Sequence, residues 1–324
     1  MTKALITGGA GFIGCHLARA LLARGVEVEL LDNFSRGARD RDVDELRAGG
    51  AVLHDRDLLH ASAFDAVSDD YTHLFHLAAI VGVRHVLDRP YEVLRDNVLM
   101  LERTLAFCRT QLRLERLVFA STSEVYAGTL QHFRLPIPTP EATPLALTDL
   151  AHPRTSYMLS KIYGEAMCHQ AEVPFTIVRP HNVYGPRMGM AHVIPELLRK
   201  AFQAPDGGVL EVYSASHRRT FCYVDDAVEL IRLAADAPDG RDATLNIGSE
   251  GPEISMGELG EAVRRIVGKS LRIVALPDTP GSPARRCPDM TRTTAVTGYS
   301  PQTGLDDGIA ATYAWYQPHL TQAT

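Results

Sequence analysis

The chain has 324 residues, a length that suggests one large domain or one large and one small domain. Apolar residues make up 45% and charged residues 22%, values near the average for soluble globular proteins, which exclude a disordered chain, a collagen-like repeat and a coiled coil. The formal net charge is −6, and mixed-sign segments such as residues 36–47 indicate solvated surface, so we expect no nucleic-acid partner.

Cysteines and histidines show no pattern typical of disulfides or metal sites. The five cysteines are scattered and include no CxxC pair, and none of the 13 histidines stands in an HExxH spacing. The apolar stretch at the start is too short for a signal peptide, and no run approaches 18 apolar residues. We therefore expect a cytoplasmic protein without a metal ion or a membrane partner.

Short apolar runs alternate with helical patterns in the first half of the chain. Such runs, bounded by polar or glycine-containing turns, are typical of strands that are covered on both faces. Strand followed by helix, repeated, predicts an α/β fold with a Rossmann-type, doubly wound parallel sheet. The expected strands are 3–7, 27–31, 51–54, 73–76, 117–120 and 175–178, and the expected helices are 12–24, 91–109 and 156–170.

The rhythm changes beyond about residue 186, where turn-rich pieces separate shorter elements. Helices are expected over 193–202, 227–235, 256–267 and 307–315, and strands over 209–213, 243–247 and 271–274. We predict a dinucleotide-binding domain over residues 1–186 and a smaller α/β lobe formed mainly by residues 187–324, with some later segments returning to the sheet.

A glycine-rich turn links the first expected strand to the first expected helix. Gly8, Gly11 and Gly14 allow a tight turn, close approach of the backbone to a pyrophosphate and close packing of helix on strand. The following helix start presents unpaired N–H groups and a positive dipole end to the phosphates. The turn with its flanking elements predicts a dinucleotide site.

Asp32 ends the second expected strand, 18 residues after Gly14. A carboxylate there accepts hydrogen bonds from the adenosine ribose and repels a 2′-phosphate, which favours NAD over NADP. Arg36 argues the other way, because an arginine can accept that phosphate. Asp57 and Leu58 after the third strand could meet the adenine, and Leu77, Ala78 and Ala79 after the fourth are small enough for close approach to the cofactor.

Tyr157 and Lys161 stand four residues apart, on one face of an expected helix. A tyrosine hydroxyl with its usual pKa of about 10 is a poor base at neutral pH. A lysine ammonium and an oxidised nicotinamide both stabilise the phenolate and lower that pKa. Thr122, at the carboxyl end of the fifth strand, points into the crevice where ligands bind and can hydrogen-bond a substrate hydroxyl that Tyr157 deprotonates.

Together these motifs resemble the extended short-chain dehydrogenase/reductase family, in its nucleotide-sugar epimerase, dehydratase and decarboxylase branch. The resemblance covers nearly the whole chain and rests on TGGAGFIG, HLAA, STSEVY, YxxxK, RPHNVYGP, RTFCYVD and RCPD in family order. It implies NAD as cofactor, a nucleotide-diphosphate sugar as substrate and a homodimer built on residues 91–109 and 156–170.

The resemblance also implies roles for single residues. Thr122, Tyr157 and Lys161 would be catalytic, with Ser123 and Glu124 as further candidates. The cofactor-binding set would be Gly8, Gly11, Phe12, Ile13, Gly14, Asp32, Asn33, Asp57, Leu58, Leu77, Ala78, Ala79, Asn97, Tyr157, Lys161 and Pro180. The substrate-binding set would be Val83, Arg84, Asn182, Arg187, Arg219 and Arg286, where arginines suit phosphate oxygens.

The reaction stays open between outcomes that share oxidation of the sugar at C4. Our leading interpretation is an NAD-dependent nucleotide-sugar 4-epimerase, favoured by residues 81–84, which resemble a loop of uronate 4-epimerases. A nucleotide-uronate decarboxylase is the alternative, because Thr122-Ser123-Glu124 resembles the decarboxylase pattern, and Ser123 replaces the aspartate expected of a dehydratase. Glu124 could equally be a capping or surface carboxylate.

Two other classes remain as hypotheses. An NAD(P)H-dependent ketone reductase is disfavoured by Asp32 and the arginines, and a non-catalytic nucleotide sensor by retention of both Tyr157 and Lys161. The 31 residues that separate Tyr126 from Tyr157 exceed the usual family spacing, and His181 and His192 stand where apolar or other polar groups are expected near the sugar; a structural role is the favoured interpretation for both histidines.

Overall fold

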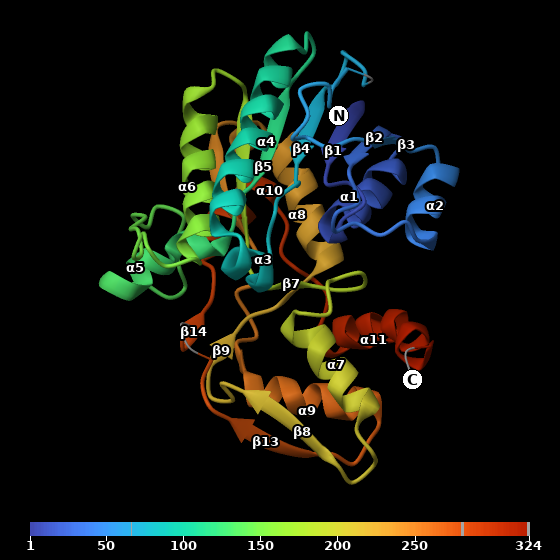
Figure 1. Ribbon diagram of the computed structural model, residues 1–324, viewed down its shortest axis with the longest axis vertical. Helices are drawn as coiled ribbons and strands as arrows, with labels where there is room; N and C mark the ends of the chain where they lie inside the picture. Colours follow the sequence, from blue (N-terminus) through green and yellow to red (C-terminus); the bar gives the residue numbers. More distant parts are fainter. Residues whose placement is uncertain (66, 280–281, 323–324) are drawn as a thin grey trace.

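The computed structural model describes residues 1–65, 67–279 and 282–322, with only the backbone described at residues 83, 84, 321 and 322. Figure 1 shows two bodies: a sheet flanked by helices, and below it a smaller body that contains α7, α9, α11, β8 and β13. The predicted fold class is confirmed.

Seven parallel strands form the central sheet in the order β11-β6-β5-β4-β1-β2-β3. From β1 the chain builds the sheet outward on one side through β2 and β3, and then on the other side through β4, β5 and β6. The switch lies between β1 and β4, so their carboxyl ends border the crevice in which such sheets bind ligands. The strands are β1 (Lys3–Thr7), β2 (Glu27–Asp32), β3 (Val52–Asp55), β4 (His73–His76), β5 (Arg116–Ala120), β6 (Phe175–Pro180) and β11 (Ala243–Ile247).

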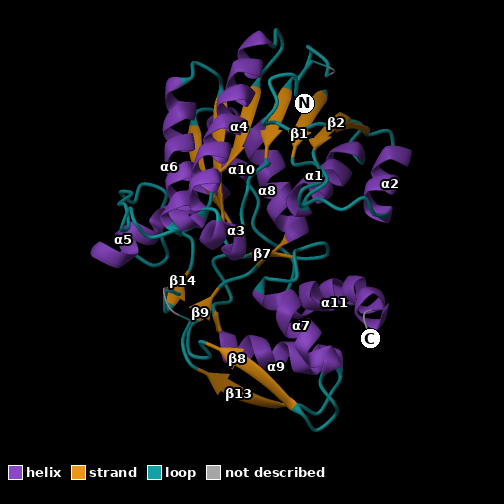
Figure 2. Cartoon of the chain, in the orientation of Figure 1, coloured by secondary structure: helices purple, strands orange, loops and turns teal. Residues whose placement is uncertain are grey.

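Helices cover both faces of this sheet, as Figure 2 shows. One face is packed by α1 (Phe12–Leu22) and α8 (Val224–Asp236), whose apolar side chains share a core with Ile6, Leu30 and Val118. The other face is packed by α4 (Pro90–Thr110) and α6 (Thr155–Gln170), around Leu74, Leu117 and Phe119. Gly164 lets α6 approach the sheet closely, because a Cβ there would lie 2.5 Å from the Phe119 ring.

The smaller body has its own core between three helices and a two-stranded parallel sheet. Its elements are α7 (Val193–Gln203), α9 (Met256–Val267), α11 (Leu305–Gln322), β8 (Val209–Tyr213) and β13 (Arg272–Leu276). A serine cap begins α9: the Ser255 hydroxyl accepts from the Glu258 N–H while the Glu258 carboxylate accepts from the Ser255 N–H.

The remaining elements are short. They are α2 (Arg41–Ala48), α3 (Val83–Asp88), η1 (Ser123–Tyr126), α5 (Ala127–His132), η2 (Pro238–Gly240), α10 (Thr291–Thr297), β7 (Val183–Tyr184), β9 (Arg218–Arg219), β10 (Cys222–Tyr223), β12 (Ile254–Ser255) and β14 (Arg285–Arg286). Strand β9 pairs with both β12 and β14, so residues distant in the sequence meet in one small sheet.

Most expected elements are present, and the differences lie at the connections. Segment 36–47, interpreted only as solvated surface, holds all but the last residue of α2, whose N-terminus is capped by the Asp40 carboxylate accepting from the Val43 N–H. The short helices α3, α5 and α10 were not expected either. The helix expected over 307–315 begins at Leu305 and continues to Gln322, past Pro318.

Candidate active site

Thr122, Tyr157 and Lys161 meet at the carboxyl end of β5. Thr122 follows the strand and caps η1, its hydroxyl accepting from the Glu124 N–H at 3.2 Å. The Thr122 hydroxyl also acts on the Tyr157 phenol, lowering its pKa. Lys161 Nζ donates to the Ala120 carbonyl at 2.7 Å and lies 5.8 Å from the centre of the Tyr157 ring. The predicted set is therefore close together in space.

The chain itself does not lower the pKa of Tyr157. Burial raises it to about 12, the charge of Glu124 acts in the same direction, and the Thr122 hydrogen bond and the Arg36 charge oppose them. Burial also lowers the pKa of Lys161 to about 8. Of the two positive charges expected to stabilise the phenolate, the lysine is thus held by the Ala120 carbonyl, and the oxidised nicotinamide must supply much of the effect.

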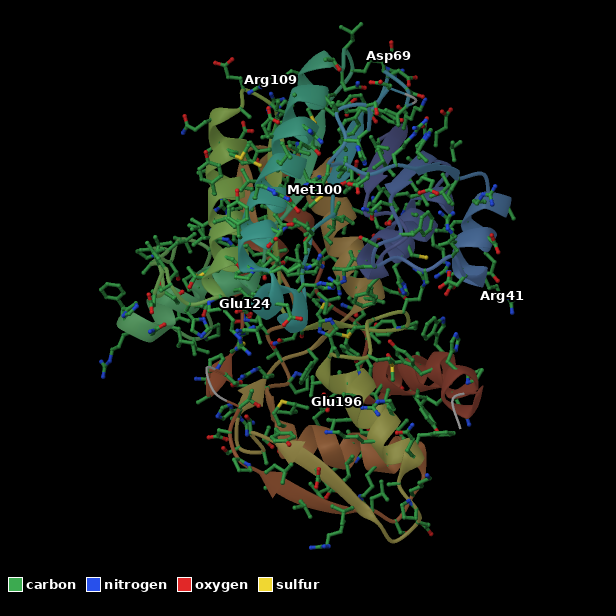
Figure 3. All side chains as sticks on the ribbon, in the orientation of Figure 1. Arg41, Asp69, Met100, Arg109, Glu124 and Glu196 are labelled. Atoms are coloured by element: carbon green, nitrogen blue, oxygen red, sulfur yellow. The ribbon has the colours of Figure 1, made fainter. Side chains whose placement is uncertain are left out.

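Glu124 forms an ion pair with Arg286 beside this set. The Arg286 Nη1 atom lies 2.9 Å from the Glu124 Oε1 atom, and the Glu124 side chain is 46% exposed. Arg286 is the main cause of a lowered pKa of Glu124, and Arg154 and Arg219 act in the same direction. Figure 3 labels Glu124, which lies at the level where the two bodies meet. A capping role alone does not describe this carboxylate.

Strand pairing brings together Arg219 and Arg286, the two arginines of β9 and β14 that are predicted to bind substrate. The register of β9 with β14 sets Arg219 opposite Arg286, and burial together with the Arg286 charge lowers the pKa of Arg219 to about 10. Arg219 Nη2 donates to the Ser282 hydroxyl at 3.0 Å and to the Pro283 carbonyl, and Nη1 donates to the Arg218 carbonyl. Two neighbouring guanidinium groups at one edge suit anionic groups of a substrate, whether phosphate or carboxylate.

Asn182 begins the connection from β6 to β7 with a left-handed backbone, φ +42°. Its Nδ2 atom donates to the Thr220 carbonyl at 2.9 Å, and its own carbonyl accepts from the Cys222 N–H. The side chain thereby fixes the segment that carries Arg219. A contact of Asn182 with substrate stays a prediction.

The glycine-rich turn has the close contacts that a pyrophosphate site requires. A Cβ on Gly8 would lie 2.8 Å from the Ala78 nitrogen, and a Cβ on Gly14 would collide with the Gly8 carbonyl. Gly11 is the N-cap of α1, followed by Phe12 and Ile13, so the free N–H groups of the helix start face the end of β1. These residues fit a dinucleotide, and only glycine fits at Gly8 and Gly14.

Asp32 is buried at the end of β2 and organises the adjacent loop. Its Oδ2 atom accepts from the Ala10 N–H at 3.0 Å and its Oδ1 atom from the Phe34 N–H at 2.8 Å. Burial raises its pKa, and the two backbone donors oppose that rise. The carboxylate therefore lies within one hydrogen bond of the glycine-rich turn.

The remaining residues predicted to contact the cofactor border the same crevice. Asn33 donates to the Asp57 carboxylate at 3.0 Å, and Asn97 bonds both the N–H and the carbonyl of Ile80. Leu58 lies in the segment after β3 and is buried. The others lie at strand ends: Leu77, Ala78 and Ala79 after β4, and Pro180 as the last residue of β6. Their contacts with a cofactor stay predictions.

Arg187, predicted to bind substrate, is occupied by the nucleotide-binding turn. Its Nη2 atom lies 2.7 Å from the Asp40 carboxylate, and its Nη1 atom donates to the carbonyls of Ala10 and Gly11 at 3.1 and 3.3 Å. The side chain is 4% exposed. In this structure Arg187 connects the segment after β7 to the turn.

Three other predicted residues are less defined. Val83 and Arg84 begin α3, and their side chains lie outside the described residues. Ser123 is buried in η1, directly between Thr122 and Glu124.

The two unusual histidines differ in their surroundings. Asn246 Nδ2 donates to the carbonyls of Thr139 and Asp289, so its Oδ1 atom is an acceptor and the His181 Nε2 atom 3.0 Å away carries the proton. Burial lowers the pKa of His181 to about 3, which keeps it neutral. His192 is exposed as the N-cap of α7. His181 is thus a buried histidine fixed by a hydrogen bond to Asn246, as the structural interpretation expects.

Sequence reasoning missed Arg154, which acts on the Glu124 carboxylate from the N-cap of α6. Its spacing of three residues from Tyr157 places both on one helix face, which was the available signal.

The described residues include neither a membrane-spanning helix nor a cluster of metal-ligating side chains. Among them, no helix is long and apolar enough to cross a membrane. In the same part of the chain, no three His, Cys, Asp or Glu side chains gather in a way that could hold a metal ion.

Fold and site together define a nucleotide-binding enzyme of the short-chain dehydrogenase type, and comparison with known proteins agrees. Residues 4–248 match the model of the NAD dependent epimerase/dehydratase family, and the chain belongs to that family. It uses NAD as the family does.

Individual relatives represent more than one reaction. The chain is 32% identical to the UDP-N-acetyl-alpha-D-glucosaminuronate decarboxylase of Bacillus cytotoxicus, over 97% of this chain and 98% of the relative. It is 30% identical to UDP-glucuronic acid decarboxylase 5 of Arabidopsis thaliana, over 95% and 87%. Among solved structures, a UDP-galactose 4-epimerase superposes with a TM-score of 0.80 at 29% identity, over 98% and 100%. The two decarboxylase relatives favour the decarboxylase alternative over the leading 4-epimerase interpretation.

Proposed function

We propose that the protein is an NAD-dependent nucleotide-uronate decarboxylase, the alternative of the sequence interpretation. The observation that carries the proposal is the ion pair of Glu124 and Arg286 beside Thr122 and Tyr157. An epimerase needs only the hydroxyls and the lysine at the reacting carbon, whereas a uronate brings a carboxylate that requires a cation. The two decarboxylase relatives add support.

Each residue at this edge has a place in the reaction. Arg286 offers further N–H donors to the substrate carboxylate, and Glu124 holds its guanidinium in position. Tyr157 as phenolate removes the proton from the C4 hydroxyl, and Thr122 orients that hydroxyl. Lys161 contributes positive charge to the phenolate. Bound NAD⁺ supplies the acceptor for the C4 hydride and returns it in the last step.

Oxidation at C4 makes the uronate a β-keto acid, which explains the loss of carbon dioxide. The electron pair of the C5–C6 bond moves toward the C4 oxygen, where the hydroxyls of Thr122 and Tyr157 stabilise the enolate. A proton from solvent then reaches C5, and re-reduction of the C4 ketone gives a nucleotide pentose. Arg219 and Asn182 hold the diphosphate portion of the substrate in this arrangement.

Turnover in D₂O tests the reaction. UDP-glucuronate, UDP-N-acetylglucosaminuronate, UDP-glucose and UDP-galactose are each incubated with the enzyme and NAD⁺, and the products are analysed by mass spectrometry. We expect one uronate to lose carbon dioxide and gain one carbon-bound deuterium. Conversion only with retained mass and no deuterium would overturn the proposal in favour of epimerisation, and loss of water would indicate a dehydratase.

A 4-epimerase is the second candidate. It is favoured by the full-length superposition on a UDP-galactose 4-epimerase and by the resemblance of residues 81–84 to a uronate 4-epimerase loop.

We further propose a homodimer formed through α4 and α6. Tyr91 on α4 and Tyr163 on α6 are 68% and 54% exposed, and these two helices lie side by side on the outer face of the sheet (Figure 1). Light scattering coupled to gel filtration tests the mass in solution, and replacing Tyr163 with glutamate is expected to give the monomer mass.

A further inference from the structure

One row of side chains on α6 holds three consecutive residues at the end of β5. Tyr157, Lys161 and Glu165 are four residues apart, so they form a single row along the helix. Thr122 lowers the pKa of the Tyr157 phenol, Lys161 Nζ donates to the Ala120 carbonyl at 2.7 Å, and the Glu165 carboxylate accepts from Ser121 at 2.5 Å. Tyr157 and Lys161 are thus two of the three residues in this row, and Glu165 is the third.

Glu165 is fixed in turn by Arg179 of β6. The Arg179 Nη2 and Nε atoms lie 2.6 and 2.9 Å from the two carboxylate oxygens, in a bidentate pair, with side chains 5% and 8% exposed. The Ser121 hydroxyl and the Arg179 Nε atom share the Oε1 atom, so each oxygen of the carboxylate has a donor.

The network continues to a third strand. Arg179 Nη1 donates to the Tyr126 hydroxyl at 2.7 Å, and this hydroxyl donates to Asn246 Oδ1 on β11 at 3.1 Å. The carboxyl ends of β5, β6 and β11 are therefore joined by one buried set of hydrogen bonds. Thr122 and Asn182 stand directly beyond two of these ends.

A buried ion pair is a poor source of stability, because removing two charges from water costs about as much as their attraction returns. Apolar residues of similar volume would serve the core equally well or better. Placing this pair directly behind Thr122 therefore points to precision of geometry, where a shift of about 1 Å can cost about 100-fold in rate.

We propose that Glu165 is a positioning residue for the reaction: it sets Thr122 against Tyr157 through Ser121, and its charge supports the ammonium of Lys161. The proposal rests on the proposed function only in that Thr122, Tyr157 and Lys161 carry the chemistry, whichever product results.

The charge contribution follows from what surrounds Lys161. Burial lowers its pKa to about 8, and Cys168 and Glu165 on the same helix oppose that change. The other ionisable neighbours are Tyr157, whose ring lies 5.8 Å away, and His76 of β4, which burial keeps neutral with a pKa of about 3. Arg179 is the cation behind Glu165. Glu165 is thus the one carboxylate that these contacts bring to Lys161 within the described chain.

Two variants separate geometry from charge. Ser121→Ala removes the link to Thr122 but leaves every charge in place, so kcat should fall about 5- to 10-fold with KM within about 2-fold, the size of one hydrogen bond. Glu165→Gln removes the charge and leaves one acceptor oxygen where Ser121 and Arg179 need two, so kcat should fall more than about 10-fold. Lys161 is charged below its pKa, so the alkaline limb of the pH profile should move to lower pH in Glu165→Gln and stay in place in Ser121→Ala.

Thr176→Val is the matched control. Thr176 is fully buried on β6, accepts from Arg116 and donates to the Gly240 carbonyl at 2.6 Å, at the end of the strand away from the site. Thr176→Val should lower the free energy of unfolding as much as Ser121→Ala does, while kcat and the pH profile stay as in the parent. Glu165→Asp keeps the charge on a shorter side chain, so the alkaline limb should return while kcat remains low.

Equal kcat for Ser121→Ala and Thr176→Val, or an unmoved alkaline limb in folded Glu165→Gln, would overturn the proposal. If Glu165→Gln does not fold, the comparison of Ser121→Ala with Thr176→Val decides alone. Should the parent convert no uronate, the proposed function fails by itself. In that case the same variants are compared by the phenolate absorbance of Tyr157 in the NAD⁺ complex, where only the Ser121 and Glu165 changes should raise the titration midpoint.

Discussion

The carboxylate of Glu124 and the guanidinium of Arg286 approach to 2.9 Å, although the first follows the fifth strand and the second belongs to a two-residue strand near the end of the chain. Their pairing joins the catalytic edge of the sheet to the smaller body. Arg286 is the largest cause of the lowered pKa of Glu124, so the ion pair persists to lower pH than an ordinary glutamate would allow.

Replacing Arg286 with methionine should release this carboxylate and remove the cation for a uronate. We expect kcat/KM for the converted uronate to fall at least about 100-fold, as for a charged hydrogen-bond donor used in the transition state. The apparent pKa of Glu124 should rise, so the acid limb of the remaining activity should move to higher pH. Steady-state kinetics across pH measure both effects. Arg285→Met on the same strand, whose guanidinium pairs with Glu253 at 2.7 Å, is the control; equal losses would contradict the assigned role.

Tyr157 should titrate differently with and without the oxidised cofactor. Burial raises its pKa to about 12 in the chain, and the phenolate forms only as pH rises through that value. A positive nicotinamide ring nearby favours the phenolate, so the midpoint should fall by at least about 1 unit when NAD⁺ is bound. Phenolate absorbance, taken as the difference from Tyr157→Phe, gives the midpoint. An unchanged midpoint would mean that Lys161 and NAD⁺ do not activate this tyrosine.

Gly14→Ala should abolish NAD binding. Its Cβ would collide with the Gly8 carbonyl, and two backbone segments cannot separate without opening the turn. We expect the Kd for NAD to rise at least about 100-fold, measured by calorimetry. Gly251→Ala is the control, because a Cβ there meets nothing within 4 Å. Tight binding by folded Gly14→Ala would show that the dinucleotide lies elsewhere.

Arg187→Ala should weaken the attachment of the smaller body to the turn. Its guanidinium is 4% exposed, while the carboxylate of its partner Asp40 is 28% exposed, so we expect a loss of about 1–3 kcal/mol in the free energy of unfolding. Urea denaturation measures the loss, and NAD affinity should fall with it because the carbonyls of Ala10 and Gly11 lose their donor. Arg41→Ala, which removes a 91% exposed partner of Glu45, should change neither. If instead Arg187→Ala raises KM for the nucleotide sugar alone, the original prediction of substrate binding holds.

The parallel sheet could be predicted because its strands are short apolar runs that end in turns with strict chemical requirements, as at Gly8 to Gly14. The pair Tyr157 and Lys161 could be predicted because helical spacing alone places them on one face. Glu165 escaped notice because its function depends on Arg179 and Ser121, which come from two other elements.

Other parts depended on contacts that no local pattern contains. Arg187 has the right residue type and position for substrate, but a left-handed backbone with φ +66° turns it toward Asp40. The pairing of Glu124 with Arg286 requires the register of β14 with β9. Each of these strands has only two residues, which is too short for a recognisable strand pattern in the sequence. The reaction, for the same reason, could not be chosen from the order of motifs.

The edge position of β11 has a consequence for synthesis on the ribosome. Strand β6 emerges long before its partner β11, since the smaller body's first helix and strands lie between them in the chain. At roughly 5–20 residues per second, β6 waits several seconds with one row of backbone groups unpaired. A nascent chain that stops near residue 186 therefore exposes the unpaired edge of β6, which can bind chaperones or other nascent chains. Fragments that end there should precipitate.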